Sequence, residues 1–390
     1  MPRNSRRPSR SNSKAGRTKV RSHIARTAKG GSPTFGWWLS AALIVVALCL
    51  VFATPPAPTV ERLYARGWYP AFQPFLTSLS SLFPIAVFDL LIVGLVAWAV
   101  SRVYPVVRAA RGDRGRRAVT AFVDFAAGAS AVYLAFLAIW GLNYRRLPLE
   151  SQMDFASGRV TPAAVQSLAT RSVQEINRLY AAAHADPAAT ASLQAVRVRL
   201  APAFAQAQRD LGAATLATPA RPKAPLISPF FRWATVDGMV NPFGLEVLIN
   251  PDVLPIERPY VVAHEWGHIA GWAREGEAGY VGWLTCLRGD DAARYSAWVS
   301  LFLHLRGELP PPVRARLDSG LAAGPLRDFG AIRERLERGR PAVQRASWRA
   351  YDTFLKANRV DEGIRSYDDI VSLVIGIATD ADGRPRRRDE

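Results

Sequence analysis

Three long apolar runs lie in the first 142 residues, and they constrain the fold more than any other feature of the chain. They cover residues 36–54, 82–101 and 119–142, and each is close to the ~20 residues that a helix needs to cross a bilayer. The first run, GWWLSAALIVVALCLVFA, carries no charge and opens with two tryptophans suited to a membrane interface. We therefore predict a membrane domain, residues 35–144, with three transmembrane helices in contact with membrane lipids.

The basic residues predict how these helices are oriented. The formal net charge is +18, and Lys and Arg gather in residues 1–34, 102–118 and 381–390. None of these clusters is interleaved with aromatic residues, so we expect no nucleic-acid partner. Because basic segments stay on the cytoplasmic side of a membrane, the N-terminus is expected in the cytoplasm and everything after residue 144 on the opposite side, which for a bacterial inner membrane is the periplasm or the outside of the cell. The two terminal segments lack the apolar residues needed to fold and are expected to be disordered.

Residues 145–380 have the composition of one folded domain outside the membrane. Apolar residues recur at helical spacing over residues 161–212, and helical patterns return after residue 259. Two short strand-like pieces, 224–228 and 245–250, stand between them among Pro, Gly and aromatic residues. The expected fold is therefore mainly α, with three N-terminal transmembrane helices followed by a mostly helical domain that contains a small β-element.

The string AHEWGHIAGWAREGEA, residues 263–278, carries the pattern of a metal site. His264 and His268 stand one helical turn apart, so both imidazoles can bind one metal ion while Glu265 acts as general base on a bound water. The chain has five histidines, so this spacing rarely arises by chance. Two His and one carboxylate suit Zn²⁺ best, with Fe²⁺, Mn²⁺ or Co²⁺ as alternatives. We predict one Zn²⁺ per chain.

A zinc hydrolase needs a third protein ligand, and two nearby glutamates are candidates. Gly271 lets the chain turn back after His268, so that Glu275 or Glu277 can face the same ion, while a remote carboxylate is the remaining alternative. The string EGEA that begins at Glu275 resembles the E-x-x-A-D element of several membrane-associated zinc peptidases of the gluzincin type, whose first Glu binds the metal. The resemblance favours Glu275, although Gly279 stands where those peptidases carry Asp.

Two further features would serve hydrolysis of a peptide. Tyr295, in the string DDAARYSAW, is the expected donor to an oxyanion, and Tyr280 is a weaker candidate. The stretch NPFGLEVLIN, residues 241–250, suits an edge strand that aligns an extended peptide through main-chain hydrogen bonds. These features favour a peptide or protein as the substrate.

Taken together, the three apolar runs, the string WGLNYRRLP at residues 140–148, NPFG, HEWGH and the GEA element resemble an uncharacterised bacterial membrane-protein family with an HExxH site. The resemblance covers residues 36–380 and implies a gluzincin-like metallopeptidase site. Charged residues that flank HExxH, such as Arg258 and Arg274, argue against an intramembrane protease. We expect a membrane-anchored zinc metallopeptidase of the cell envelope; the alternative is a catalytically inactive zinc-binding scaffold or binding module. The oligomeric state and the substrate sequence stay open.

Overall fold

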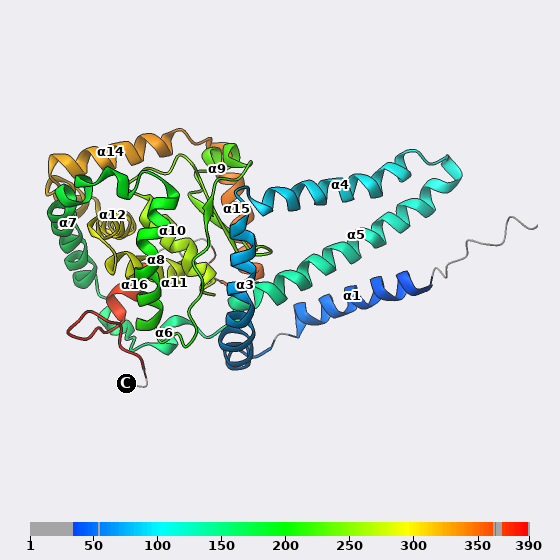
Figure 1. The fold of residues 1–390 in the computed structure, drawn as a ribbon, viewed down its shortest axis with the longest axis horizontal. Coiled ribbons are helices and arrows are strands. Elements are labelled where there is room, and N and C mark those ends of the chain that lie inside the picture. The colour runs from blue at the N-terminus through cyan, green and yellow to red at the C-terminus, as the bar shows by residue number, and fades with distance from the viewer. Residues whose placement is uncertain (1–33, 54, 362, 364–368, 389–390) are drawn as a thin grey trace, which may run out of the picture.

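The computed structural model describes residues 34–53, 55–361, 363 and 369–388. The chain is mainly helical, with 72% helix and a small three-stranded sheet, which confirms the expected class. Figure 1 shows a folded body from which a stalk of long helices extends. The predicted N-terminal tail lies outside the described residues, apart from Thr34.

The stalk consists of α1 (Thr34–Phe52), α4 (Val87–Val107) and α5 (Arg111–Ile139), and α5 packs against both of the others. Helices α4 and α5 are each long and apolar enough to cross a membrane, and α1 reaches that length with the bent segment that follows it. The helix expected over 82–101 begins later because Pro84 stands in a non-helical link before it. The helix expected over 119–142 begins earlier, since the basic loop continues its helical backbone.

The segment between α1 and α4 folds onto the body, which differs from the predicted boundary at residue 144. It forms α2 (Ala57–Val60), the π-helix η1 (Glu61–Trp68) and α3 (Tyr69–Leu82). Tyr64 and Tyr69 belong to the main hydrophobic core. Gln73 donates to the carbonyl of Thr218, and Thr77 to that of Leu245. Buried polar groups need such partners, so this segment is part of the body.

The start of α4 is fastened to the sheet of the body. Glu246 accepts hydrogen bonds from the backbone N–H groups of Val87 and Phe88, both at 2.9 Å, and forms a buried 2.7 Å ion pair with Lys223. Asp89, in the first turn of α4, accepts from the backbone N–H of Leu226. A carboxylate at a helix N-terminus is favoured by the unpaired N–H groups there. The stalk and the sheet therefore form one connected unit.

Helix α10 (Arg258–Ile269), which contains HExxH, runs through the centre of the body and packs against α8, α11 and α12. Helix α12 in turn packs against α7. The other helices of the body are η2 (Gly141–Arg145), α6 (Leu149–Gln152), η3 (Ser157–Arg159), α7 (Pro162–Ala185), η4 (Pro187–Ala189), α8 (Leu193–Asp210), α9 (Ser228–Ala234), α11 (Glu275–Leu287), α12 (Asp291–Glu308), α13 (Pro311–Ser319), α14 (Ala323–Glu337), α15 (Pro341–Ala357) and α16 (Asp369–Gly376).

The sheet contains β1 (Pro222–Lys223), β2 (Gly238–Asn241) and β3 (Glu246–Ile249), in the order β1-β3-β2. Strand β3 pairs parallel with β1 and antiparallel with β2. The strand predicted over 245–250 is thus present as β3, but it is central and not an edge strand. The edge next to α10 is β2, and the strand expected over 224–228 is replaced by a loop and the start of α9.

The C-terminal segment is ordered as far as residue 388, which corrects the prediction of disorder for residues 381–388. Arg387 forms an antiparallel bridge with Met153, and the N–H of Asp154 donates to the carbonyl of Arg386. Main-chain hydrogen bonds hold this basic segment in place, and these depend little on side-chain composition.

Candidate metal centre

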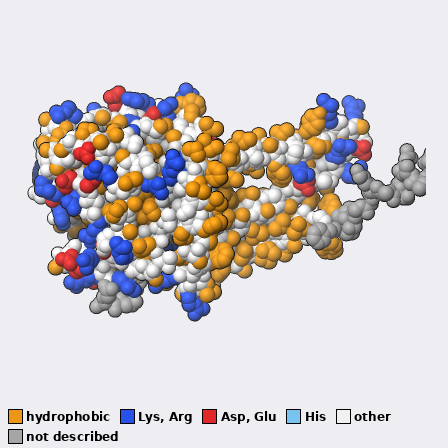
Figure 2. Space-filling model, in the orientation of Figure 1, with side chains coloured by type: hydrophobic (Ala, Val, Ile, Leu, Met, Phe, Trp, Pro, Cys, Tyr) orange, Lys and Arg blue, Asp and Glu red, His pale blue; other side chains and the backbone are white. Residues whose placement is uncertain are grey.

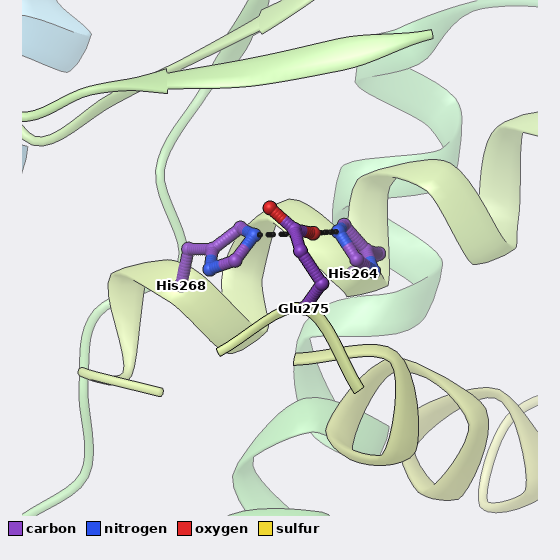
Figure 3. A group of neighbouring side chains, drawn as sticks. All are labelled: His264, His268 and Glu275. Atoms are coloured by element: carbon purple, nitrogen blue, oxygen red, sulfur yellow. Dashed lines mark hydrogen bonds and ion pairs between the residues drawn. The ribbon is translucent and has the colours of Figure 1, made fainter. Parts of the chain in front are cut away.

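Three side chains from two helices converge on one point. His264 and His268 lie one turn apart on α10, and Glu275 is the first residue of α11. Figure 3 shows both imidazoles directed at the carboxylate of Glu275. Glu275 Oε2 lies 3.1 Å from His264 Nε2 and 3.4 Å from His268 Nε2. The structure thus unites the three residues expected to bind the metal.

A tight turn after α10 returns the chain to the site. Gly271 has φ +87°, its N–H donates to the carbonyl of His268, and the N–H of Trp272 donates to that of Gly267. This pair of bonds is a Schellman motif, in which a left-handed residue ends the helix and glycine is strongly preferred. The predicted role of Gly271 is confirmed, and the turn places Glu275 opposite the two histidines.

Side chains from the stalk end of the chain secure the same turn. Trp140 Nε1 donates to the carbonyl of His268 at 3.0 Å, and the Tyr69 hydroxyl donates to that of Ile269 at 2.7 Å. Arg146 donates to the carbonyl of Gly271 at 3.1 Å and stacks over the ring of Trp272. The last carbonyls of a helix lack partners within it and need external donors. Two of the donors to this turn, Trp140 and Arg146, belong to the string WGLNYRRLP, which therefore has a structural role beside the metal site.

His268 is held in the orientation that a metal ligand requires. Its Nδ1 lies 2.8 Å from the carbonyl of Trp272, so a proton on Nδ1 donates to that carbonyl and Nε2 faces Glu275. Its ring also meets that of Trp140 edge to face. In metal sites such an outer hydrogen bond fixes the imidazole tautomer and raises its basicity.

The electrostatics of the site favour a cation. Burial by itself raises the pKa of Glu275, but His268 and His264 outweigh it and hold that pKa well below its usual range. Burial lowers the pKa of His268, yet the carboxylate of Glu275 more than offsets this and the pKa rises to about 9. Burial lowers the pKa of His264. Glu275 therefore stays ionised in a buried position, where it attracts positive charge.

Glu265 lies beside the group, under strand β2. A Cβ added to Gly238 of β2 would stand 2.6 Å from Glu265 Oε1, so the two are in close contact. Glu265 Oε2 is buried and has no hydrogen-bond partner among the described residues. Burial raises the pKa of Glu265 to about 8. A buried carboxylate with one unpaired oxygen next to three potential ligands has the placement of a general base.

The group fits a zinc ion. Two imidazole nitrogens and a carboxylate oxygen lie within 4.8 Å of one another. Tetrahedral bonds of about 2.05 Å place neighbouring ligands roughly 3.3 Å apart, and the distances from Glu275 Oε2 to the two imidazole nitrogens, 3.1 and 3.4 Å, are close to this value. The outer carbonyl on His268 and the unpaired oxygen of Glu265 complete the features expected of such a centre.

Comparison with known proteins places the chain in a family without a known activity. Residues 64–375 match the family described as "Protein of unknown function (DUF3810)". The chain belongs to the DUF3810 family. No curated protein and no solved structure matches it. The expected membership of an uncharacterised family is confirmed, and the DUF3810 match includes the metal group, α4 and α5.

The structure separates the other candidate residues of the DUF3810 chain from the metal group. Glu277 is buried, and its carboxylate accepts a hydrogen bond of 2.8 Å from the backbone N–H of Leu149, the first residue of α6. Tyr295 donates to Asp328 at 2.6 Å, on the side of α12 that faces α7. A tyrosine that does contact the metal group is Tyr351 of α15, whose hydroxyl lies against Glu275 Oε1. The geometry therefore favours Tyr351 over Tyr295 for a role at the centre.

Sequence reasoning missed Tyr351 because no local pattern links it to HExxH. It stands 76 residues from Glu275, and three helices, α12, α13 and α14, lie between the two residues in the chain. The available signal was the amphipathic pattern of α15, which puts Tyr351 near Trp348 and Phe354 on one side of a helix. That pattern predicts burial of one face but does not predict which residue the face contacts.

Proposed function

We propose that this protein is a membrane-anchored zinc metallopeptidase that hydrolyses peptide or protein amide bonds. The observation that carries the proposal is the convergence of His264, His268 and Glu275 on one point beside the buried carboxylate of Glu265. A Zn²⁺ ion held there would polarise the scissile carbonyl and activate a water molecule for attack on it.

Glu265 performs the proton transfers in this proposal. It accepts a proton from the attacking water and returns it to the amide nitrogen as the C–N bond breaks. Burial raises the pKa of Glu265, and a Zn²⁺ ion bound beside it would lower that pKa again and keep the carboxylate ionised, ready to accept the proton. Tyr351 positions Glu275 through its hydroxyl, while the carbonyl of Trp272 positions His268.

Strand β2 is placed to align an extended substrate. It forms the edge of the sheet, and Gly238 at its start lies directly against Glu265. An edge strand offers unpaired main-chain N–H and C=O groups to a peptide that lies alongside it. The amide bond to be cleaved would then run past the general base.

The same proposal places the body on the outer side of the bacterial inner membrane. Helices α1, α4 and α5 are taken as three spans, and Figure 2 shows their surfaces covered by hydrophobic side chains, with Lys and Arg at the far end of the stalk. The basic residues of that end include Arg108, Arg111, Arg114, Arg116 and Arg117. Basic loops remain cytoplasmic, so the body would lie in the periplasm or outside the cell.

Metal analysis of the detergent-purified protein tests the centre. We expect about one zinc per chain in the wild type, in Glu265→Gln and in Glu277→Gln, and loss of zinc in His264→Ala and Glu275→Gln. Glu277→Gln is the matched control, because Glu277 is a buried glutamate of the same helix that binds Leu149 instead. A wild type without metal would refute the hydrolase.

A degradation assay separates the enzyme from a zinc-binding scaffold. Wild type and Glu265→Gln are incubated with a library of random-sequence peptides, and the products are identified by mass spectrometry. Cleavage by the wild type that Glu265→Gln lacks, at equal zinc content, supports the peptidase. Equal zinc with no cleavage by either protein would favour the catalytically inactive scaffold.

A further inference from the structure

Helix α3 carries its polar and apolar side chains on unexpected faces. Gln73 and Thr77 are fully buried and hydrogen-bond to the body. On the outward face Phe75 is 72% exposed, Leu82 is 74% exposed, and Leu79 is exposed as well. A helix on the surface of a water-soluble domain has the opposite arrangement, with its apolar face inward. The outward face of α3 is therefore suited to surroundings less polar than water.

Helix α15 presents a second apolar surface. Trp348 is 51% exposed, and Phe354 is partly exposed while its ring contacts that of Phe136 in α5. Basic residues accompany these aromatic side chains along the helix: Arg345, Arg349 and Lys356. Aromatic residues combined with Lys and Arg on one amphipathic helix are typical of segments that lie in a membrane interface.

Both helices adjoin the stalk. A short link joins α3 to α4, and Trp68 donates to the carbonyl of Ala138 near the end of α5. Leu226, which is highly exposed, is bonded through its N–H to Asp89 in the first turn of α4. Figure 1 shows α3 running across the direction of the stalk helices at the end of the body where the stalk begins, with α15 labelled at the same end.

We call the exposed apolar side chains of this end the stalk-facing surface: Phe75, Leu79, Leu82, Leu226, Trp348 and Phe354. Figure 2 shows hydrophobic side chains continuing from the stalk onto this end of the body. Contiguous exposed apolar surface marks an interaction site. Its continuity with helices apolar enough to span a bilayer identifies the lipid bilayer as the occupant.

The metal centre lies directly behind this surface. Tyr351, which stands between Trp348 and Phe354 in α15, contacts the metal-site residue Glu275. Trp140, the residue after α5, packs its ring against His268 and donates to its carbonyl. Helix α15 therefore carries both a contact to the metal group, through Tyr351, and two residues of the stalk-facing surface.

We propose that the stalk-facing surface rests on the outer leaflet of the membrane that the stalk spans, and that the centre cleaves polypeptide segments bordering the bilayer. The substrate class is the juxtamembrane region of membrane-anchored proteins. This inference rests on the proposed function for the cleavage. The seating of the surface on lipid rests on the exposed side chains and on their continuity with the stalk helices, and it can be measured without any activity.

Nitroxide labelling tests the seating in vesicles of phosphatidylethanolamine and phosphatidylglycerol. Single labels are placed in the full chain at Phe75→Cys and Trp348→Cys, with Cys49→Ala as background because Cys49 is exposed. The matched control is Leu326→Cys. Leu326 is an exposed leucine of α14, and it lies near the end of α14 that packs on Tyr180 of α7. The measured quantity is collision with oxygen, which concentrates in lipid, relative to collision with a water-soluble nickel chelate.

We expect the oxygen-to-nickel ratio at Phe75→Cys and Trp348→Cys to exceed that at Leu326→Cys several-fold. Equal ratios at the three positions would overturn the seating. All three variants are compared for zinc content and thermal unfolding, so that a label that perturbs the fold is recognised.

Tethered peptides test the substrate class in the same vesicles. Random ten-residue peptides are attached to phosphatidylethanolamine either directly or through a Gly/Ser spacer of about 30 residues, which spans roughly 30 Å. We expect the directly attached library to be cleaved at least as fast as the spaced one. Cleavage of the direct library at less than a tenth of the spaced rate would overturn the juxtamembrane assignment. Cleavage of neither library would refute the peptidase itself, while the nitroxide ratios still decide the seating.

Discussion

Arg146 connects the segment between α1 and α4 to the turn that carries Glu275, and its replacement by Met tests that connection. Its guanidinium forms a 3.0 Å ion pair with Glu61, and the two side chains are 9% and 6% exposed. Breaking a buried pair leaves an uncompensated charge and costs about 3–5 kcal/mol. Arg66 also forms an ion pair with Glu61 at 2.9 Å, but its side chain is 58% exposed. It therefore offsets no more than about 1 kcal/mol of the loss caused by removing Arg146. We expect Arg146→Met to lower the free energy of unfolding by about 2–4 kcal/mol.

Thermal unfolding followed by tryptophan fluorescence in detergent measures this loss. For a body of this size about 1 kcal/mol shifts the Tm by 2–4 °C, so Arg146→Met should unfold roughly 5–15 °C below the wild type. The matched control is Arg178→Met, which removes a surface pair with Glu175 and should change stability by about 0–1 kcal/mol. The double variant Glu61→Gln with Arg146→Met should recover much of the loss. A shift of less than about 2 °C in Arg146→Met would refute the reasoning.

The pH dependence provides a second check on the same pair. Burial raises the pKa of Glu61, but Arg146 and Arg66 outweigh it and leave that pKa below its ordinary value of 4.5. A depressed pKa contributes stability above the unfolded value that is lost as the pH falls through the folded value. In Arg146→Met burial dominates and the pKa of Glu61 rises, so protonation relieves the unpaired charge. The difference in Tm between wild type and variant should therefore shrink as the pH falls from 7 toward 4.5.

Two glycines next to the centre give further predictions. Gly271→Ala forces a side chain into φ +87°, which costs about 1–2 kcal/mol, so this variant should have a lower zinc content and a lower Tm. The control is Gly158→Ala, whose added Cβ has nothing within 4 Å. It should match the wild type. Gly238→Ala places a Cβ 2.6 Å from Glu265 Oε1, so cleavage should fall about 10- to 100-fold at unchanged zinc content. Loss of zinc in Gly238→Ala, or full activity, would contradict the placement of β2 over the general base.

Sequence patterns predicted the features that depend on neighbouring residues. Once the segment is helical, the spacing of His264 and His268 places both side chains on the same face of the helix. Gly271 predicts the left-handed turn that ends this helix. The apolar runs marked the stalk helices because a bilayer requires about 20 residues of one character. In each case the physical constraint acts within a few turns of chain.

Features that depend on distant contacts escaped prediction. Sequence patterns assigned no element and no role to the segment that forms α3, yet its polar residues Gln73 and Thr77 are buried because they satisfy backbone groups of the body. Arg146 stands in a recognisable motif, but its partners Glu61 and Gly271 lie far away on either side. The C-terminal residues up to 388 are ordered through main-chain bonds. Composition carries no information on such pairings.

These distant contacts predict that the metal centre cannot form without the segments that flank the stalk. A chain shortened to residues 145–390 keeps His264, His268 and Glu275 but loses Tyr69 and Trp140, which donate to the last carbonyls of α10. Each is a buried aromatic residue whose loss costs about 3–5 kcal/mol. Together these losses approach the whole stability of a domain, about 5–15 kcal/mol.

The shortened chain should therefore be insoluble or unfold without a cooperative transition, and it should bind no stoichiometric zinc. The matched comparison is a chain that begins at residue 56, which loses α1 but keeps both donors, and this chain should retain zinc in detergent. Circular dichroism, gel filtration and metal analysis measure the difference. A soluble fragment 145–390 with one zinc per chain would show that the turn after α10 is stable by itself. If the fragment 145–390 binds no zinc while the chain 56–390 does, the membrane-proximal segments are part of the metal centre.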